Sequence, residues 1–173
     1  HAYKYLQASS FSEADFRFAQ SHLFITSFLY GLLRPLDKIH PYRMEAKVHL
    51  HAAEDQNMFA FWRSRLTDAL IEAVKKDDGV LIHLATEEYE HLFDWKRVCR
   101  EVKVVQPLFY VEKGDSMKVV SVYAKRCRGA MTRCIIQNKW HQPDELLAFN
   151  EAGFSYQPHY GDKLHPHFIF KQT

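Results

Sequence analysis

Apolar positions recur at helical spacing in two long segments of the chain. Residues 58–75 and 123–138 carry apolar side chains every three or four positions, which is the spacing of one buried helix face. Asn57 is a favourable N-cap for the first of these segments, and Gly79 follows its end, where a glycine commonly stops a helix. The pattern therefore predicts two long amphipathic helices.

Shorter helices are predicted from their start signals. Ser12 and Asp15 form an imperfect capping box ahead of a helix at residues 13–22. Thr86 can cap a helical segment, and Pro143 suits the first turn of a helix that extends to about residue 150.

Strands are predicted where apolar runs are short or alternate with polar residues. Lys113, Gly114 and Asp115 predict a hairpin turn. Gly31, Pro35 and Pro41 predict a compact loop or a single helical turn at residues 32–40. The predicted strands cover residues 23–30, 42–50, 80–84, 102–111, 117–122, 154–156 and 168–170. At residues 23–30 a continuation of the preceding helix is the alternative, since periodicity does not exclude it. This mixed order of helices and strands predicts an α+β fold, with a central mixed sheet flanked by helices.

The composition predicts one domain over residues 1–173. Hydrophobic residues make up 47% of the 173 residues, enough for one sizeable core. Lys and Arg number 23 against 21 Asp and Glu, so the overall charge does not require an anionic partner, and a basic site must come from local clustering. No apolar run approaches the length of a membrane span, so we expect no membrane partner.

The cysteines indicate a reducing compartment. Their number, three, is odd, and no signal peptide precedes them. If Cys127 and Cys134 lie on one helix, their Cα atoms are about 10 Å apart, too far for a disulfide. We expect both to be buried thiols.

Eleven histidines raise the question of a metal site. The pairs His49 with His51 and His165 with His167 would each share one face of a strand. No Glu or Cys lies at an obviously matching offset, so we favour surface histidines over a metal site, and we expect no cofactor.

The predicted helix at 123–138 holds the densest positive charge in the chain. Arg126 and Arg133 project along one flank, two turns apart, beside an apolar face. Gly129 costs about 1 kcal/mol of helix stability relative to Ala, which suggests close approach of a backbone or a ligand. The alternative is an ordinary solvated face. The basic residues of this helix are Lys125, Arg126, Arg128 and Arg133.

A second candidate segment covers residues 29–45. It is a glycine-containing bend that can direct backbone N–H groups at a phosphate, with Arg34 and Arg43 adding charge. The alternative is a proline-stiffened turn in which Asp37 and Arg34 pair locally.

These two segments carry a resemblance to a known family. Leu-Tyr-Gly-Leu-Leu-Arg-Pro-Leu-Asp at 29–37, Pro-Tyr-Arg at 41–43 and Tyr-Ala-Lys-Arg-Cys-Arg-Gly-Ala-Met at 123–131 resemble the signatures of the YaaA peroxide-stress proteins. The resemblance runs from about Tyr3 to Lys171 without large gaps. The family's opening segment, with its Ser-Pro-Ala-Lys motif, is absent, so we interpret the chain as N-terminally truncated relative to the family.

The resemblance implies a function and a set of site residues. It implies a cytoplasmic protein with helix-hairpin-helix-like DNA contacts that limits peroxide damage by lowering available iron. We expect a non-enzymatic protein that holds DNA, duplex or branched, largely independently of sequence. The expected DNA or anion ligands are Tyr30, Gly31, Arg34, Arg43, Tyr123, Lys125, Arg126, Arg128 and Arg133. The expected supporting carboxylates, which would orient the arginines, are Asp37, Glu45 and Glu88.

Two alternatives stay open. The first is an enzyme of unassigned catalytic residues, whose cleft, completed by the missing N-terminal lysine, acts on a small anionic or nucleotide-like substrate. The second is direct iron sequestration through His165 and His167. The leading hypothesis depends on one spatial expectation, that both arginine-bearing segments face one groove.

Overall fold

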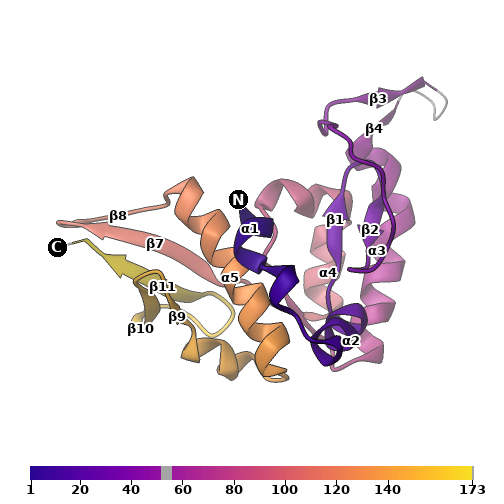
Figure 1. The fold of residues 1–173 in the computed structure, drawn as a ribbon. Helices are drawn as coiled ribbons and strands as arrows, with labels where there is room; N and C mark the ends of the chain where they lie inside the picture. Colours follow the sequence, from indigo (N-terminus) through magenta and orange to yellow (C-terminus); the bar gives the residue numbers. More distant parts are fainter. Residues whose placement is uncertain (52–55, 173) are drawn as a thin grey trace. The chain divides into compact units, whose positions relative to one another are not determined.

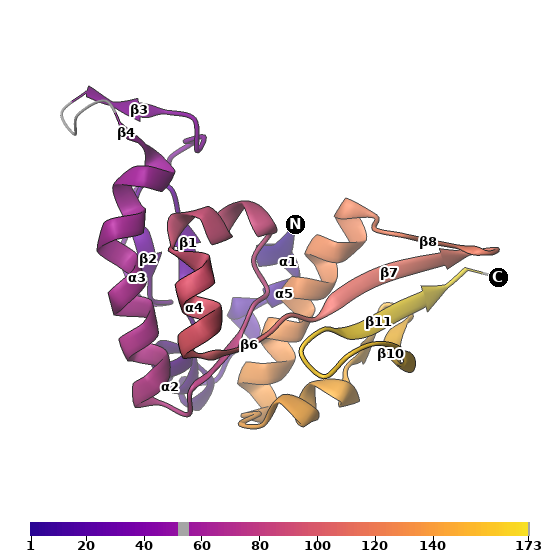
Figure 2. The ribbon, with the colours of Figure 1, turned by 180° about the vertical axis from the view of Figure 1, so that it is seen from behind.

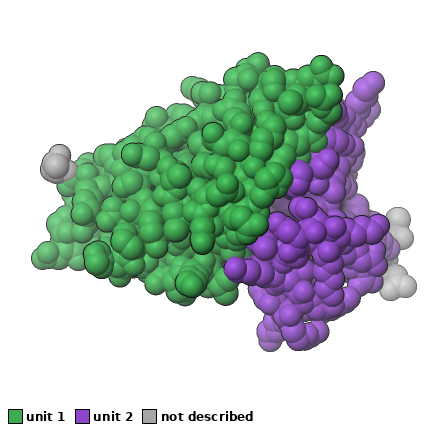
Figure 3. Space-filling view, turned by 90° about the horizontal axis from the view of Figure 1, so that it is seen from below, with its two compact units in different colours: residues 1–18, 82–84, 105–173 green, residues 19–81, 85–104 purple. Residues whose placement is uncertain are grey.

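The chain forms two compact units. The computed structural model describes residues 1–51 and 56–172 (Figure 1). Unit 1 contains His1–Phe18, Ile82–Leu84 and Val105–Thr173, and unit 2 contains Ala19–Leu81 and Ala85–Val104 (Figure 3). Each unit combines helices with strands, and the predicted α+β class is confirmed. One domain over residues 1–173 stays a prediction.

Unit 1 is built on a five-stranded mixed sheet in the order β8-β7-β11-β10-β9 (Figure 2). β11 pairs with β7 in parallel, and the other neighbours are antiparallel. The strands are β7 (Leu108–Lys113), β8 (Ser116–Lys118), β9 (Asn150–Glu151), β10 (Phe154–Gly161) and β11 (Pro166–Lys171). The helices are α1 (Ala2–Leu6), η1 (Ala8–Ser10), α5 (Ser121–Asn138) and η4 (Pro143–Ala148). α5 lies along the sheet in both views (Figure 1 and Figure 2).

Unit 2 packs its helices and hairpins around a separate apolar core. Its elements are β1 (Ile25–Ser27), β2 (Gly31–Leu33), β3 (His49–Leu50), β4 (Gln56–Asn57), α3 (Met58–Lys76), η3 (Glu87–Leu92) and α4 (Trp95–Glu101). α2 (Glu13–His22), β5 (Val80–Ile82) and β6 (Lys103–Val105) each contain residues of both units. The core residues include Met58, Leu66, Leu70, Leu92 and Val98.

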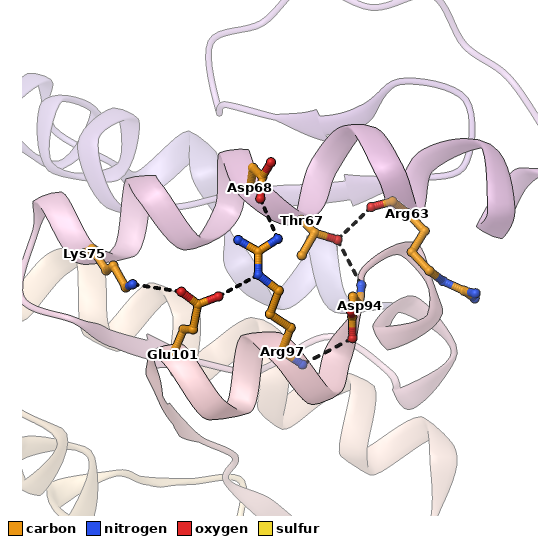
Figure 4. A network of polar contacts seen from close by, with 7 residues as sticks. All are labelled: Arg63, Thr67, Asp68, Lys75, Asp94, Arg97 and Glu101. Carbon is orange, nitrogen blue, oxygen red and sulfur yellow. Dashed lines mark hydrogen bonds and ion pairs between the residues drawn. The ribbon is translucent and has the colours of Figure 1, made fainter.

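A polar network joins α3 to α4 in unit 2 (Figure 4). The guanidinium of Arg97 donates to Asp68 and to Glu101, each at 2.6 Å, and Lys75 donates to the other oxygen of Glu101 at 3.0 Å. The buried hydroxyl of Thr67 accepts from the backbone N–H of Asp94 at 2.9 Å. These bonds fix the two helices beside the shared core.

The predicted helix caps are confirmed at three positions. The backbone N–H of Ser12 donates to Asp15 at 2.9 Å and that of Asp15 donates to the Ser12 hydroxyl at 3.1 Å, so the capping box forms with Asp in place of Glu. Asn57 accepts from the N–H of Ala60 at 2.9 Å. Gly79 follows α3 with a φ of 78°, and its N–H donates to the carbonyl of Val74 at 2.9 Å.

The ion pair between Asp15 and Lys139 makes stability depend on pH. Lys139 donates to the buried Asp15 carboxylate at 2.5 Å and, with the N–H of Ser12, lowers the pKa of Asp15. A lowered carboxyl pKa stabilises the fold above the unfolded value, about 3.9, and the contribution disappears as pH falls through the folded value. We expect Asp15→Asn to be less stable than the wild type at pH 7, with the difference shrinking under acid.

Urea unfolding of both proteins across a pH series measures this difference. Asp144→Asn, at an exposed residue of η4, is the matched control and should change stability little at any pH. A stability difference for Asp15→Asn that is constant with pH would contradict the assignment.

The predicted strand at residues 23–30 is wrong over most of its length. Only Ile25–Ser27 is extended, because the Ser27 hydroxyl accepts the backbone N–H groups of Leu29 and Tyr30 at 3.2 and 3.0 Å and turns the chain. Gly31, with a φ of 75°, is the first residue of β2. The sequence had predicted that the strand would end at this glycine and that a loop would follow.

Other predicted strands are shorter than expected. The strand at 102–111 is divided at Pro107, which has no N–H to donate to a ladder. The strand at 117–122 ends at Lys118, because α5 already begins at Ser121. The strand at 42–50 is reduced to β3. The helices α1 and α4 were not predicted.

Candidate nucleic-acid interface

Gly129 lets the backbone of α1 lie directly on α5. A Cβ atom at Gly129 would lie 2.1 Å from the carbonyl oxygen of Ala2 and 3.1 Å from the N of Leu6. Only a residue without a side chain fits such an approach. The close contact predicted at Gly129 is confirmed, and its partner is the backbone of α1.

The apolar side of α5 is buried largely as predicted. Ala124, Ala130 and Met131 are at most 4% exposed. Cys134 and Ile135 are only half-buried. One side of α5 is therefore held against the rest of unit 1.

The two cysteines of α5 are protected thiols. Burial raises the pKa of Cys127 to about 12. Burial, reinforced by Glu151, raises the pKa of Cys134 to about 11. Because the thiolate is the nucleophile, both side chains are poorly reactive at neutral pH.

Arg133 is tied into the fold by two partners. Its guanidinium donates to the carbonyl oxygen of Tyr5 at 2.7 Å and to both carboxylate oxygens of Glu151, at 2.5 Å for Oε1. The Arg133 side chain is 12% exposed, and that of Glu151 is 37% exposed. Arg133 therefore joins α5 to α1 and β9, and its charge is offset by a carboxylate.

The other basic residues of α5 differ in their exposure. Lys125 is exposed, and Arg126 and Arg128 are half-buried. The Arg126 guanidinium lies 4.7 Å from the centre of the Tyr5 ring, a cation–π distance. A role for Lys125, Arg126 and Arg128 in binding an anion stays a prediction.

A pocket adjoins this part of α5 within unit 1. Its volume is about 310 Å³. Its lining residues are Tyr5, Gln7, Arg126, Cys127, Ala130, Arg133, Phe149, Glu151 and Ala152. Tyr5 and Glu151 were not among the predicted site residues. Tyr5 precedes the start of α5 by more than a hundred positions, and no local pattern in the sequence links either residue to this helix.

Arg34 is held against the β1-β2 hairpin in unit 2. Its guanidinium lies 3.6 Å from the centre of the Phe24 ring and donates to the carbonyl of Leu23 at 3.4 Å. Burial lowers the pKa of Arg34, which nevertheless stays charged at neutral pH. The backbone N–H of Arg34 donates to Asp37 at 2.7 Å, so a local Arg34–Asp37 turn forms.

Two tyrosines hold the irregular segment after β2. The Tyr30 hydroxyl accepts from the N–H of His40 at 3.1 Å, and the Tyr42 hydroxyl bonds to that of Ser27. The two tyrosine rings meet edge to face at 5.5 Å. Arg43, next to Tyr42, is exposed.

Gly31 is buried under a tryptophan. A Cβ atom there would lie 2.9 Å from the Trp62 ring, and the Trp62 N–H donates to the carbonyl of Phe28 at 2.6 Å. The need for glycine in this turn is therefore explained by packing. A role for Gly31 or Tyr30 in binding a phosphate stays a prediction.

The two arginine-bearing segments belong to different units. Arg34 and Arg43 are in unit 2, whereas α5 is in unit 1, so their shared groove stays a prediction. Glu45 and Glu88 are exposed, and their role as partners of arginines also stays a prediction. Tyr123 is 42% exposed at the start of α5.

Two further results concern metals and membranes. Among residues 1–51 and 56–172, no three or more His, Cys, Asp or Glu side chains are arranged to hold a metal ion. His165 contacts Asp162 at 3.0 Å, and the His167 ring stacks on that of Tyr160.

No helix in the described part of the chain has both the length and the apolar character that a bilayer crossing requires.

Comparisons with known proteins agree with the resemblance. A family model described as "Peroxide stress protein YaaA" matches residues 1–160. The chain is 47% identical to a UPF0246 protein of Bacteroides thetaiotaomicron over 93% of its own length and 63% of the relative. It is 46% identical to one of Phocaeicola vulgatus, over 97% of its own length and 65% of the relative. It is 44% identical to one of Porphyromonas gingivalis, over 98% of its own length and 66% of the relative.

The chain thus spans slightly less than two thirds of these curated relatives. The family model nevertheless covers most of the chain, including both arginine-bearing segments. The chain therefore belongs to the YaaA family of peroxide stress proteins.

Proposed function

We propose that this protein acts in the response to peroxide stress and that it does so by binding DNA largely independently of sequence. The observation that carries the proposal is the arrangement of α5. One side of this helix is buried against the sheet and α1, while Lys125 is exposed and Arg126 and Arg128 are only half-buried. Cations fixed on a rigid helix suit the phosphate groups of a nucleic acid backbone.

The segment after β2 adds support from unit 2. Arg43 is exposed beside Tyr42, and Arg34 is held in one orientation by Phe24 and Leu23. A fixed guanidinium loses less side-chain freedom when it binds a phosphate than a mobile one does. In the proposal Arg133, which is paired with Glu151, positions α5 and does not itself contact DNA.

The cellular part of the proposal is that the protein works in the cytoplasm and reduces available iron. Family membership supports the link to peroxide, and the three free cysteines fit a reducing compartment. Chelatable iron in peroxide-treated cells, measured with and without the gene, tests this part. Equal iron in the two strains would contradict it.

Fluorescence anisotropy with two unrelated duplexes of equal length tests the binding proposal. Because the contacts go to phosphates, we expect dissociation constants that agree within about twofold, since phosphate contacts carry no direct sequence information. Absence of binding, or strong preference for one duplex, would contradict the proposal.

A further inference from the structure

The pocket beside α5 combines one of the proposed DNA contacts, Arg126, with groups that those contacts do not use. Tyr5 closes it from the side of α1, and Glu151 from β9. Its apolar wall includes Cys127, Ala130 and Phe149, all at most 4% exposed. Its volume of about 310 Å³ is at the lower end of the range for small-molecule sites. The pocket therefore suits a small ligand that is partly apolar.

The charged groups of the pocket carry a net positive charge. Two guanidinium groups, those of Arg126 and Arg133, face one carboxylate, that of Glu151. The donors of Arg133 are engaged by the Tyr5 carbonyl and by Glu151. Among the residues that line the pocket, Arg126 is therefore left without a carboxylate that offsets its charge.

Arg126 is positioned but forms no hydrogen bond with any residue that the structure describes. Its guanidinium lies 4.7 Å from the centre of the Tyr5 ring, which restrains its orientation. A guanidinium presents five N–H donors in a planar fork that matches the oxygens of a phosphate. Its donors are therefore available to an anion at the pocket.

We propose that this pocket binds a phosphate monoester, with Arg126 holding the phosphate and the apolar wall contacting the organic group. The proposal goes beyond duplex binding and does not rest on it: Arg126 serves in both, but the pocket can bind a free monophosphate whether or not Lys125 and Arg128, which lie outside it, hold a duplex. A phosphate monoester could come from a free mononucleotide or from the 5′ end of a DNA strand. Both sources present the same chemistry to Arg126.

Isothermal titration calorimetry with a nucleoside 5′-monophosphate and with the corresponding nucleoside tests the proposal. We expect the wild-type chain to bind the monophosphate at least about tenfold more tightly than the nucleoside, as expected for hydrogen bonds to a charged group. Arg126→Ala should abolish this difference, and Arg126→Lys should keep part of it, because a lysine keeps the charge and loses the fork.

The matched control is Lys96→Ala, which removes an exposed cation from α4, outside the pocket and outside the proposed DNA contacts. It should leave the affinity for the monophosphate unchanged. Circular dichroism and thermal unfolding of Arg126→Ala should match the wild type, so that a lost affinity reports on the site and not on the fold.

A second titration distinguishes the two sources. If the ligand is a DNA end, a 5′-phosphorylated oligonucleotide should bind more tightly than its 5′-hydroxyl counterpart, and Arg126→Ala should remove the difference. If the ligand is a mononucleotide, only the free monophosphate shows the Arg126-dependent difference.

Three results would overturn the proposal: equal affinity for nucleoside and monophosphate, no detectable binding of the monophosphate at millimolar concentration, or wild-type affinity in Arg126→Ala. Duplex binding is tested separately, by measuring the DNA affinity of the variant in which Lys125 and Arg128 are replaced with alanine. Failure of one proposal can therefore be told from failure of the other.

Discussion

Replacing Gly129 with alanine or valine is expected to destabilise the protein by about 1–3 kcal/mol, the usual cost of overpacking, with valine the worse of the two. A Cβ atom would lie 2.1 Å from the carbonyl oxygen of Ala2, which is backbone and cannot rotate away. The loss would occur although alanine favours helix by about 1 kcal/mol over glycine. Urea unfolding measures the free-energy change, and amide exchange in α1 should show the detached segment.

Lys125→Ala is the control for this experiment, because the same helix receives an alanine at an exposed position. It should change stability by less than about 0.5 kcal/mol, as most surface substitutions do. If Gly129→Ala instead stabilised the protein through the higher helix propensity of alanine, this result would contradict the close contact between α1 and α5.

The double substitution Lys125→Ala, Arg128→Ala is expected to weaken binding to duplex DNA by about tenfold or more, the loss of at least one or two charged contacts. Both side chains belong to α5 and neither lines the pocket. Thermal unfolding of the double variant shows whether a lost affinity reports on the contacts or on the fold. Anisotropy titrations at one fixed salt concentration measure the loss.

The matched control also removes one lysine and one arginine, but from α4 and not from α5. Lys96 and Arg100 are exposed on α4, and replacing both with alanine changes the net charge by the same amount. An equal loss of affinity in the two double variants would show that only the total charge matters, and would contradict a site on α5.

Local signals predicted α2, α3 and α5, whereas α1 and α4 were not predicted. Ser12, Asn57 and Gly79 act on neighbours within a few positions, so their roles can be derived from the sequence alone. Gly129 was also identified correctly, because a glycine inside a helix needs a reason. Its partner could not be predicted, since α1 is short and has no cap side-chain bond to mark it.

Long-range partners account for most of what the sequence missed. Arg133 was predicted to bind phosphate, and no local pattern places it against Tyr5, which is 128 positions away. The hairpin turn after Ser27 was missed, because an apolar run from 23 to 30 resembles one continuous strand. The strand ends were wrong where single residues, such as Pro107, interrupt a ladder.

The central claim is that cations of α5 and of the segment after β2 hold phosphate groups. The salt dependence of DNA affinity is the most direct test of this claim. The logarithm of the wild-type association constant should fall linearly with the logarithm of salt concentration, by about 0.9 per phosphate contact. Replacing Lys125 and Arg128 with alanine should reduce the slope by up to about 1.8, and Arg43→Ala by about 0.9. The Lys96, Arg100 control should keep the wild-type slope. A wild-type slope near zero, or equal slopes in all four proteins, would contradict the account.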